Sequence, residues 1–410
     1  MIASLRNDCE AIINEVIEKS LPENAVKNAL SNFTRGKGKL ILIAIGKAGF
    51  SMAKAAVDTI GAPDMGICIT KYNHSHGIIP NVSVREAAHP IPDTNGFSAT
   101  KEAVSMCQNL SSDDTVLFLV SGGGSALFEY PLIDEQTLMQ ITDSLLKSGA
   151  DITEINTVRK HLSAVKGGRF AKICEPAKIK TIVLSDVLGD HLDVIASGPA
   201  YPDSTTGEDS LNILNKYGIS VSDEIKKVLS VDTPKSLSNV ETSIIGSVKL
   251  LCNVACDCAK RLGYFPVLLT DELTCEAREA GSFMGAIAKY QVSLGNHKVA
   301  FILGGETIVH VRGTGLGGRN QEMALAAAEG LSGKQAAFFA LGSDGTDGPT
   351  DAAGGYVDGD SLKDFQKKNI NVWEYLNNND AYNALNAIDG LIITGPTGTN
   401  VNDVSVLLIK

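Results

Sequence analysis

The sequence of 410 residues has no long apolar run and no clear targeting segment. No stretch approaches the roughly 20 consecutive apolar residues that a membrane-spanning helix needs. Residues 1–19 have the pattern of an amphipathic helix and lack the unbroken apolar core of a signal peptide. We therefore expect no membrane partner and a cytoplasmic location.

Positive charge is also scarce in this sequence. The 36 lysines and arginines are outnumbered by 47 aspartates and glutamates, which gives a formal net charge of −11. Because nucleic acids and anionic membranes repel an acidic protein, neither is expected as the main partner. A small anionic substrate remains compatible, since a local pocket can be basic on an acidic protein.

The cysteines and histidines form no recognisable metal framework. Cys252, Cys256 and Cys258 are the one cysteine cluster, but their C-x3-C-x-C spacing is not a usual zinc spacing and no histidine stands near. We interpret them as buried side chains of a helix. His74 and His76 flank a loop and lack a third ligand nearby, so a solvated loop is the better interpretation.

Several catalytic motifs are missing as well. The turn GKAG at residues 46–49 lacks the second and third glycines of a dinucleotide fingerprint. The glycines at 122–124 are not followed by the Gly-Lys-Ser/Thr of a P-loop, and no G-x-S-x-G elbow of a serine hydrolase occurs. These absences argue against hydride transfer, a Walker-type nucleotide site and ester hydrolysis.

The sequence does contain a regular alternation of short apolar strands and helices. Its length and this alternation predict two α/β domains with mainly parallel sheets, residues 1–240 and 241–410. Residues 205–240 are polar and suit a linker or a domain edge. In the second domain, residues 307–312 are expected to pair antiparallel with the strand at 298–303, which would make a mixed sheet.

The stretch LFLVSGGGSALFEYP, residues 117–131, combines an apolar strand with a glycine-rich turn. An apolar strand runs into consecutive glycines, whose backbone N–H groups can converge on an anion at the start of a helix. The alternative is a tight turn that only packs a helix on a strand. The candidate phosphate-binding residues are Ser121, Gly122, Gly123, Gly124 and Ser125.

Lys47 stands directly after another apolar strand, at the expected start of a helix. A cation at that position opposes the helix dipole, so a ligand phosphate or carboxylate would explain it. A solvated lysine is the alternative. In LSDVLGD, Asp186 ends a strand and Asp190 follows it. Either could accept a hydroxyl proton, bind Mg²⁺ or form an Asx-turn.

Further along the chain, Arg319 follows two glycines at the start of a helix, where a guanidinium could clamp a phosphate. The loop LGSDGTDGPTDAAGG places Asp344, Asp347 and Asp351 close together. Clustered carboxylates repel unless a cation or donors compensate, and Mg²⁺ at Asp344 and Asp347 would suit a phosphate site. A solvated acidic turn is equally compatible with the spacing.

From about residue 40 onward, the sequence resembles the class II glycerate kinases of the MOFRL family. The resemblance rests on several long motifs in the same order: GKAGFSMAKAA, EAAHPIPDTNG, LVSGGGSALFEYP, NTVRKHLSAVKGGRFAK, LSDVLGDHLDVIASGPAYPDSTT, LGGETIVHVRGTGLGGRNQEMALAAA, ALGSDGTDGPTDAAGG and GPTGTNVNDV. One departure is TKYNHSHG at residues 70–77, where relatives often read TKYGH.

The resemblance implies an ATP- and Mg²⁺-dependent kinase that phosphorylates D-glycerate, typically at the 2-hydroxyl to give 2-phosphoglycerate. It also implies a large Rossmann-like N-terminal domain, a smaller α/β C-terminal domain and an active site between them. Lys47, Arg319 and either Asp186 or Asp190 would be the central catalytic and substrate-contacting residues. A homo-oligomer remains open.

Three alternatives differ from this expectation in chemistry. One is a hydroxypyruvate reductase, a label that relatives have sometimes carried, although the dinucleotide fingerprint is missing. Another is phosphorylation of glycerate at the 3-hydroxyl. The third is a non-enzymatic sensor that binds a sugar phosphate through the same glycine turns and would need no acidic loop.

Overall fold

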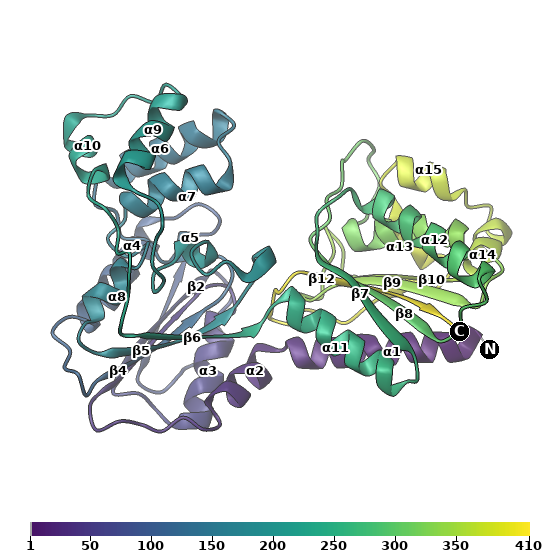
Figure 1. Cartoon of the computed structure of the whole chain (residues 1–410), viewed down its shortest axis with the longest axis horizontal. Helices are drawn as coiled ribbons and strands as arrows, with labels where there is room; N and C mark the ends of the chain where they lie inside the picture. Colours follow the sequence, from purple (N-terminus) through teal and green to yellow (C-terminus); the bar gives the residue numbers. More distant parts are fainter. Residues whose placement is uncertain (1) are drawn as a thin grey trace. The chain divides into compact units, whose positions relative to one another are not determined.

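The structure is a computed structural model that describes residues 2–410. Its contacts divide the chain into two compact units: Ala25–Ile245, and the residues up to Asn24 together with Gly246–Lys410 (Figure 1). The second break lies near the expected boundary after residue 240. The N-terminal helix α1 (Ile2–Ser20) differs from expectation, because it packs on the C-terminal unit, against α11 (Val248–Arg261). An amphipathic pattern does not specify which sheet a helix covers.

The unit of residues 25–245 is built on a six-stranded sheet of order β3-β2-β1-β4-β5-β6. The neighbours from β3 to β5 pair in parallel, as the alternation of strands and helices predicts. This order is that of a doubly wound, Rossmann-like sheet. The strands are β1 (Leu40–Ile45), β2 (Met65–Lys71), β3 (Val82–Ala87), β4 (Thr115–Val120), β5 (Lys178–Leu184) and β6 (Val240–Gly246).

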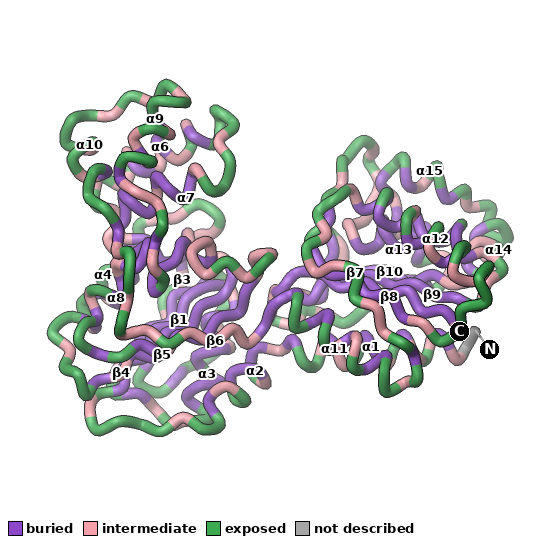
Figure 2. The backbone as a smooth tube through the Cα atoms, viewed as in Figure 1, coloured by how far each residue is buried: buried purple, intermediate pink, exposed green. Residues whose placement is uncertain are grey.

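Helices cover both faces of this sheet, so its inner strands β1, β2 and β4 are largely buried (Figure 2). Ile41, Ile43 and Ile45 of β1 face one core, which also contains apolar side chains of α4 (Thr94–Met106) and α8 (Arg169–Cys174). Helix α3 (Gly49–Ile60) packs on the other face, where Gly49 approaches the side chain of Cys68.

Four further helices of this unit form a small cluster of their own, α6 (Glu135–Lys147), α7 (Ile152–His161), α9 (Gly207–Lys216) and α10 (Asp223–Leu229). Leu214 of α9 and Leu229 of α10 pack with Leu145 of α6 and Val158 of α7. The interpretation of residues 205–240 as a linker is therefore wrong. The few apolar residues of this polar segment are enough because α6 and α7 supply the other half of the cluster.

The second unit contains a mixed sheet of order β11-β10-β9-β12-β8-β7, as the sequence predicts for this domain. β7 and β8 are parallel, whereas β12 runs antiparallel to both β8 and β9. The strands are β7 (Phe265–Leu273), β8 (Val299–Gly305), β9 (Ala336–Gly342), β10 (Gly354–Asp358), β11 (Leu391–Ile392) and β12 (Asp403–Ile409).

The prediction of a strand at residues 307–312, paired antiparallel with the strand before it, is wrong. Apart from a bridge between Ile308 and Glu276, these residues form no strand. The reason is that β8 lies between β7 and β12 and has no free edge. The antiparallel partner of β8 is the last strand of the chain, about a hundred residues away in sequence, which local patterning does not reveal.

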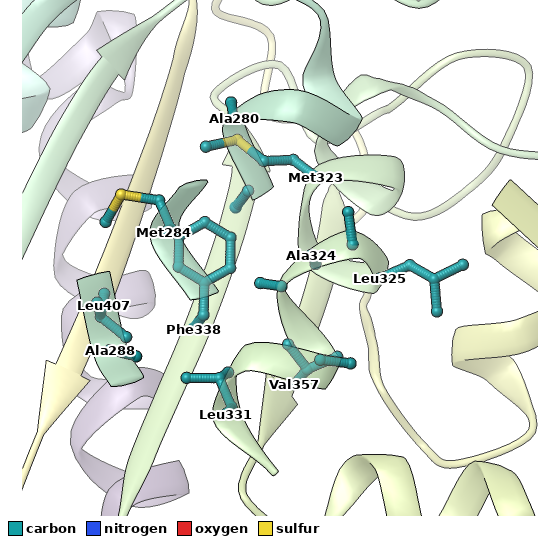
Figure 3. Packing of buried hydrophobic residues seen from close by; sticks show 14 of the residues in the cluster. Ala280, Met284, Ala288, Met323, Ala324, Leu325, Leu331, Phe338, Val357 and Leu407 are labelled. Carbon is teal, nitrogen blue, oxygen red and sulfur yellow. The ribbon is translucent and has the colours of Figure 1, made fainter. Parts of the chain in front are cut away.

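Helices also cover both faces of the mixed sheet. α1 and α11 lie on one face, and α12 (Ala277–Ser293) and α13 (Arg319–Leu331) on the other, followed by α14 (Ser361–Lys367), α15 (Val372–Asn377) and α16 (Ala381–Asn386). Figure 3 shows Met284 and Met323 packed beside Phe338 of β9. Among residues 2–410, no helix is long and apolar enough to cross a membrane.

Small residues let α12 and α13 approach closely. A β-carbon on Gly281 would lie 2.1 Å from the carbonyl oxygen of Met323, and one on Gly330 would lie 2.2 Å from the Cα of Gly285. The contact between the two helices is therefore backbone against backbone. Larger side chains at these positions would force the helices apart.

We expect Gly281→Ala to destabilise the protein, because the added methyl group collides with a backbone carbonyl that is held in α13. Overpacking of this kind should lower the free energy of unfolding by about 1–3 kcal/mol, even though alanine improves helix propensity by about 1 kcal/mol. Lys289→Ala, at an exposed position of the same helix, is the control. Urea denaturation of both variants measures the effect, and a Gly281→Ala protein as stable as the control would contradict the packing argument.

Candidate functional site

The first candidate site lies where β1 and β4 end side by side. The strand order changes direction between these two strands, and ligands of doubly wound sheets bind outside the carboxyl ends of the strands at such a point. Lys47 follows β1, and the SGGGS turn (Ser121–Ser125) follows β4. The parallel pairing of the strands thus brings two predicted elements together.

The side chain of Ser121 joins the two turns. Its hydroxyl donates to the carbonyl of Ile45 at 3.0 Å and accepts the backbone N–H of Ala48 at 3.1 Å. The backbone N–H of Lys47 in turn donates to the carbonyl of Gly122 at 2.9 Å. Ser121 is buried, and its hydroxyl holds the two turns together. Binding of a phosphate by this residue, as predicted, would therefore depend on its backbone.

Neighbouring side chains lie so close to the turn that only glycine fits at two of its positions. A β-carbon on Gly122 would lie 2.2 Å from Oδ2 of Asp186, and one on Gly123 would lie 2.9 Å from the ring of His89. Gly123 also has a φ of 84°, in the left-handed region that glycine favours. The turn is therefore surrounded by Lys47, Asp186 and His89, whose strands all end at this edge of the sheet.

The two aspartates of LSDVLGD occupy different places. Asp186 follows β5 and lies against Gly122. Asp190 is four residues further on, at the end of a short 3₁₀ turn (Leu188–Asp190), with a φ of 54°. Its Oδ1 is buried and has no hydrogen-bond partner within residues 2–410. Of the two, Asp186 is the one beside the SGGGS turn.

His89 is a site residue that the sequence reasoning missed. Burial lowers the pKa of His89 to about 4, and the positive charge of Lys47 acts in the same direction. The imidazole is therefore neutral at pH 7. The HPIP sequence after a strand was a signal of a rigid loop, but only the sheet order shows that this loop reaches the SGGGS turn.

Ser125, at the end of the turn, faces inward. Its hydroxyl lies 3.1 Å from that of Ser197, and its carbonyl accepts hydrogen bonds from Arg159 and Lys166. The helix that follows the glycines, α5 (Gly124–Leu127), has only four residues. Its dipole is correspondingly small, so any anion at this turn would depend mainly on local N–H groups and side-chain cations.

A second group of candidate residues lies on the C-terminal unit, around Arg319 at the start of α13. Its Nε and Nη2 donate to the two oxygens of Asp403 at 2.5 and 3.0 Å, and Nη1 donates to Glu306 at 2.9 Å. Burial alone would lower the pKa of Arg319, but the hydrogen bonds and charge of Asp403 outweigh it and raise the pKa. The guanidinium is thus a fixed positive charge.

Asp403 is the second residue that the sequence reasoning missed. It begins β12, and in the sheet it pairs with Gly305 of β8 on one side and Gly342 of β9 on the other. Because β12 is antiparallel to both, its first residue lies at their carboxyl ends. In the sequence, Asp403 stands only as part of the motif GPTGTNVNDV, and no local pattern indicates these neighbours.

Asp347 caps helix α13. Its carboxylate accepts the backbone N–H groups of Asn320 and Gln321 at 3.2 and 2.8 Å and the side-chain amide of Gln321 at 3.0 Å. Burial raises the pKa of Asp347 to about 6, against the effect of these backbone hydrogen bonds. Both oxygens of this predicted metal ligand are therefore used by the helix start.

Asp344 is more accessible than Asp347. Its Oδ1 accepts the backbone N–H and the hydroxyl of Thr346, which is an Asx-turn. Oδ1 of Asp344 and Oδ1 of Asp403 lie 3.4 and 3.3 Å from the position of a β-carbon on Gly342. Within residues 2–410, no group of three or more histidine, cysteine or acidic side chains is arranged to hold a metal ion by itself.

These observations define a class of protein. A glycine turn, a lysine and an aspartate meet at the switch point of a doubly wound sheet, an arrangement typical of proteins that bind phosphorylated ligands, and the C-terminal unit by itself holds an arginine fixed among carboxylates. Comparison with known proteins agrees with this class. Residues 8–230 match the DUF4147 domain of unknown function, and residues 299–403 match the MOFRL family.

Similar proteins cover the whole chain. The D-glycerate 2-kinase of Thermotoga maritima is 50% identical over 99% of this chain and 99% of its own. A crystal structure of glycerate kinase from the same organism matches with a TM-score of 0.95, 49% identity and full coverage of both chains. A protein of Agrobacterium vitis, provisionally named a hydroxypyruvate reductase, is 38% identical over 99% of this chain and 95% of its own. The chain belongs to the MOFRL family of glycerate kinases.

The low pKa of His89 is testable because Lys47 is one of its causes. Removing the lysine charge in Lys47→Met should raise the pKa of His89 from about 4. The folded pKa lies below the unfolded value of about 6.5, so the wild type should lose stability as the pH falls from 6.5 towards 4. NMR titration of the histidine ring protons measures the pKa. A value near 6.5 in the wild type would contradict the site geometry.

Proposed function

We propose that this chain transfers the γ-phosphoryl group of ATP to the 2-hydroxyl of D-glycerate and so produces 2-phosphoglycerate. The observation that carries the proposal is the meeting of Lys47, the SGGGS turn and Asp186 at the switch point of the sheet. Half of the residues are identical to those of a D-glycerate 2-kinase along the full chain, which supports this substrate and this position of phosphorylation.

The chemistry asks mainly for positioning and for neutralisation of charge. Phosphoryl transfer proceeds with charge spread over the phosphoryl oxygens, and catalysis depends on cations and N–H donors aimed at that charge. Lys47 supplies a point charge, and the N–H groups of Gly122 and Gly123 supply donors, whereas that of Gly124 donates to the carbonyl of Ser121 at 3.3 Å. Hydrogen bonds of Ser121 and Gly122 hold both elements in place before a ligand binds.

Asp186 is proposed as the base that accepts the proton of the glycerate hydroxyl. Its contact with Gly122 supports this choice over Asp190, which lies further along the chain. A base must lie within hydrogen-bond reach of the proton that it takes. The glycerate hydroxyl must approach the phosphate that it attacks, so the base is expected beside the phosphate-binding turn.

Arg319 is proposed to bind the glycerate carboxylate or the phosphoryl group in transfer. Asp403 engages its Nε and Nη2, and Glu306 its Nη1, so one N–H of each terminal nitrogen remains for a ligand. A planar guanidinium suits the paired oxygens of both groups. Asp403 supports the proposal because its two hydrogen bonds fix the orientation of the guanidinium, including the N–H groups that remain for a ligand.

Mg²⁺ is proposed as the ion that accompanies ATP, and when bound it would neutralise charge on the phosphates. Mg²⁺ usually keeps several waters and takes one or two carboxylates besides substrate phosphates. Asp344 fits this requirement, since it is accessible and near Asp403. Asp347, also predicted as a ligand, fits less well because both of its oxygens hold the start of α13.

A reductase is the weaker alternative for this fold. The strand order is compatible with a dinucleotide, but the turn after β1 is Gly46-Lys47-Ala48-Gly49 and lacks the fingerprint glycines. A β-carbon on Gly46 would already lie 2.3 Å from the hydroxyl of Ser121. This turn is thus packed against the SGGGS turn, which favours a phosphate ligand shared by both.

The proposed reaction is tested with D-glycerate, ATP and Mg²⁺, followed by ³¹P and ¹H NMR of the product. We expect 2-phosphoglycerate, and a loss of kcat/KM of about 10²–10³ in Lys47→Met, the size found when one charge-stabilising donor is removed. Lys101→Met, an exposed lysine on the same unit, is the control. Formation of 3-phosphoglycerate would refute the position, and oxidation of NADH by hydroxypyruvate without kinase activity would refute the reaction.

The metal proposal has a separate test. Removal of divalent cations with EDTA should abolish activity, and Asp344→Asn should raise the Mg²⁺ concentration needed for half-maximal rate about tenfold, as expected when one ligand of roughly 1.4 kcal/mol is lost. Asp364→Asn, which pairs with Lys367 on the surface of the same unit, is the control. Full activity in EDTA would exclude the metal, and an unchanged Mg²⁺ requirement would exclude Asp344.

A further inference from the structure

A buried lysine donates hydrogen bonds to the end of the short helix that follows the SGGGS turn. Lys166 is fully buried, and its Nζ donates to the carbonyls of Ser125 and Phe128 at 2.8 and 3.1 Å. These carbonyls belong to the last turn of the four-residue helix α5 and its C-cap. Because so short a helix is not stable on its own, its orientation depends on such contacts.

Arg159 contributes to the same contact. Its Nη2 donates to the carbonyl of Ser125 at 3.0 Å, so this oxygen accepts from both cations. Lys166 follows α7 and Arg159 lies within it, in a stretch whose basic residues could have formed a solvated face. The structure turns these two side chains inward instead, towards the end of α5 opposite to its glycines.

The charges of this cluster do not balance. Glu129 is the acidic partner and is completely buried, with an oxygen 3.6 Å from Lys166 and 3.5 Å from Arg159. Neither of its oxygens has a hydrogen-bond partner within residues 2–410. Two cations against one carboxylate leave a formal charge of +1 in a place where an unneutralised charge is costly. An anion bound at the SGGGS turn would supply the missing negative charge.

We propose that Lys166, together with Arg159, is a positioning residue of the phosphate-binding turn. It fixes the C-terminal end of α5, so that the N–H groups of Gly122 and Gly123 keep one orientation, and its excess positive charge favours the phosphates of ATP. This inference rests on the proposed function, because it takes ATP as the ligand of the turn. Lys166 itself touches neither substrate nor reacting atoms.

The protonation of Lys166 supports a pH test. Burial lowers the pKa of Lys166 to about 8, and the charge of Arg159 acts in the same direction, whereas that of Glu129 opposes it. Glu129, from the segment after α5, and Arg159, from α7, are the charged groups that face the ammonium. Above pH 8 the cluster loses its excess charge, so the affinity for ATP should fall.

The experiment compares Lys166→Met with Lys160→Met. Lys160 is also buried, and its ion pairs are with Asp203 at 3.2 Å and Asp193 at 3.7 Å rather than with the carbonyls of α5, so it matches the burial and charge of the change. We expect KM for ATP to rise at least tenfold in Lys166→Met, with a smaller fall in kcat, and to stay within twofold of the wild type in Lys160→Met. Equal KM values for ATP in the two variants would overturn the proposal.

A second pair of measurements applies even if Lys166→Met does not fold. In the wild type, kcat/KM for ATP should decline through about pH 8, and Lys166→Arg, which keeps its charge, should shift that decline upward. Arg159→Met removes the other donor to Ser125 and should also raise KM for ATP. A decline that stays in place in Lys166→Arg, or an unchanged KM in Arg159→Met, would overturn the proposal.

Binding of inorganic phosphate, followed by NMR of the glycine N–H groups, separates this inference from the proposed function. If the wild type binds phosphate and Lys166→Met binds it at least tenfold more weakly, the positioning role holds even for a protein that does not phosphorylate glycerate. If the wild type makes 2-phosphoglycerate but both lysine variants bind phosphate equally, the kinase assignment stands and the positioning role is lost.

Discussion

The hydrogen bonds of Ser121 are the interaction on which the first candidate site depends. By bonding to Ile45 and Ala48, its hydroxyl joins the ends of β1 and β4 into one surface. The parallel pairing of β1, β4 and β5 brings Lys47, Gly122 and Asp186 to one edge of the sheet, and the hydrogen bonds of Ser121 fix the turns after β1 and β4 relative to each other. A buried hydroxyl that donates and accepts is inexpensive to desolvate, since both of its hydrogen bonds are satisfied.

Both units contain buried charged side chains next to a candidate site. Lys166 lies behind the SGGGS turn, and Asp403 holds Arg319 in a two-pronged contact. Such groups are costly to bury and contribute little net stability, so their presence indicates that the orientation of a neighbouring group matters. In each unit the oriented group is one that can bind an anion: a turn of N–H donors in one and a guanidinium in the other.

Much of the architecture was predictable from local patterns. The alternation of apolar strands and helices predicts α/β domains with mainly parallel sheets, and the resemblance to the MOFRL family implies the Rossmann-like sheet. Lys47 and the SGGGS turn, both predicted as candidate site residues, lie at one edge of that sheet. The predicted strand at residues 307–312 does not form because β8 already pairs with the distant strand β12, and residues 205–240 are not a linker because α9 and α10 pack with α6 and α7. His89 and Asp403 are not predicted for the same reason, since each is brought to its place by a strand that pairs with non-local neighbours.

The sequence alone determined the class of protein, because glycine turns after apolar strands and the order of the long motifs are written in contiguous residues. It also determined which functional groups the candidate sites contain, namely the side chains of lysine, arginine and aspartate and the N–H groups of the glycine turns. Only the tertiary structure decided which aspartate lies at the SGGGS turn, which carboxylate holds Arg319, and that Lys166 points inward. Those choices depend on strand order and burial, which arise from contacts between residues far apart in the chain.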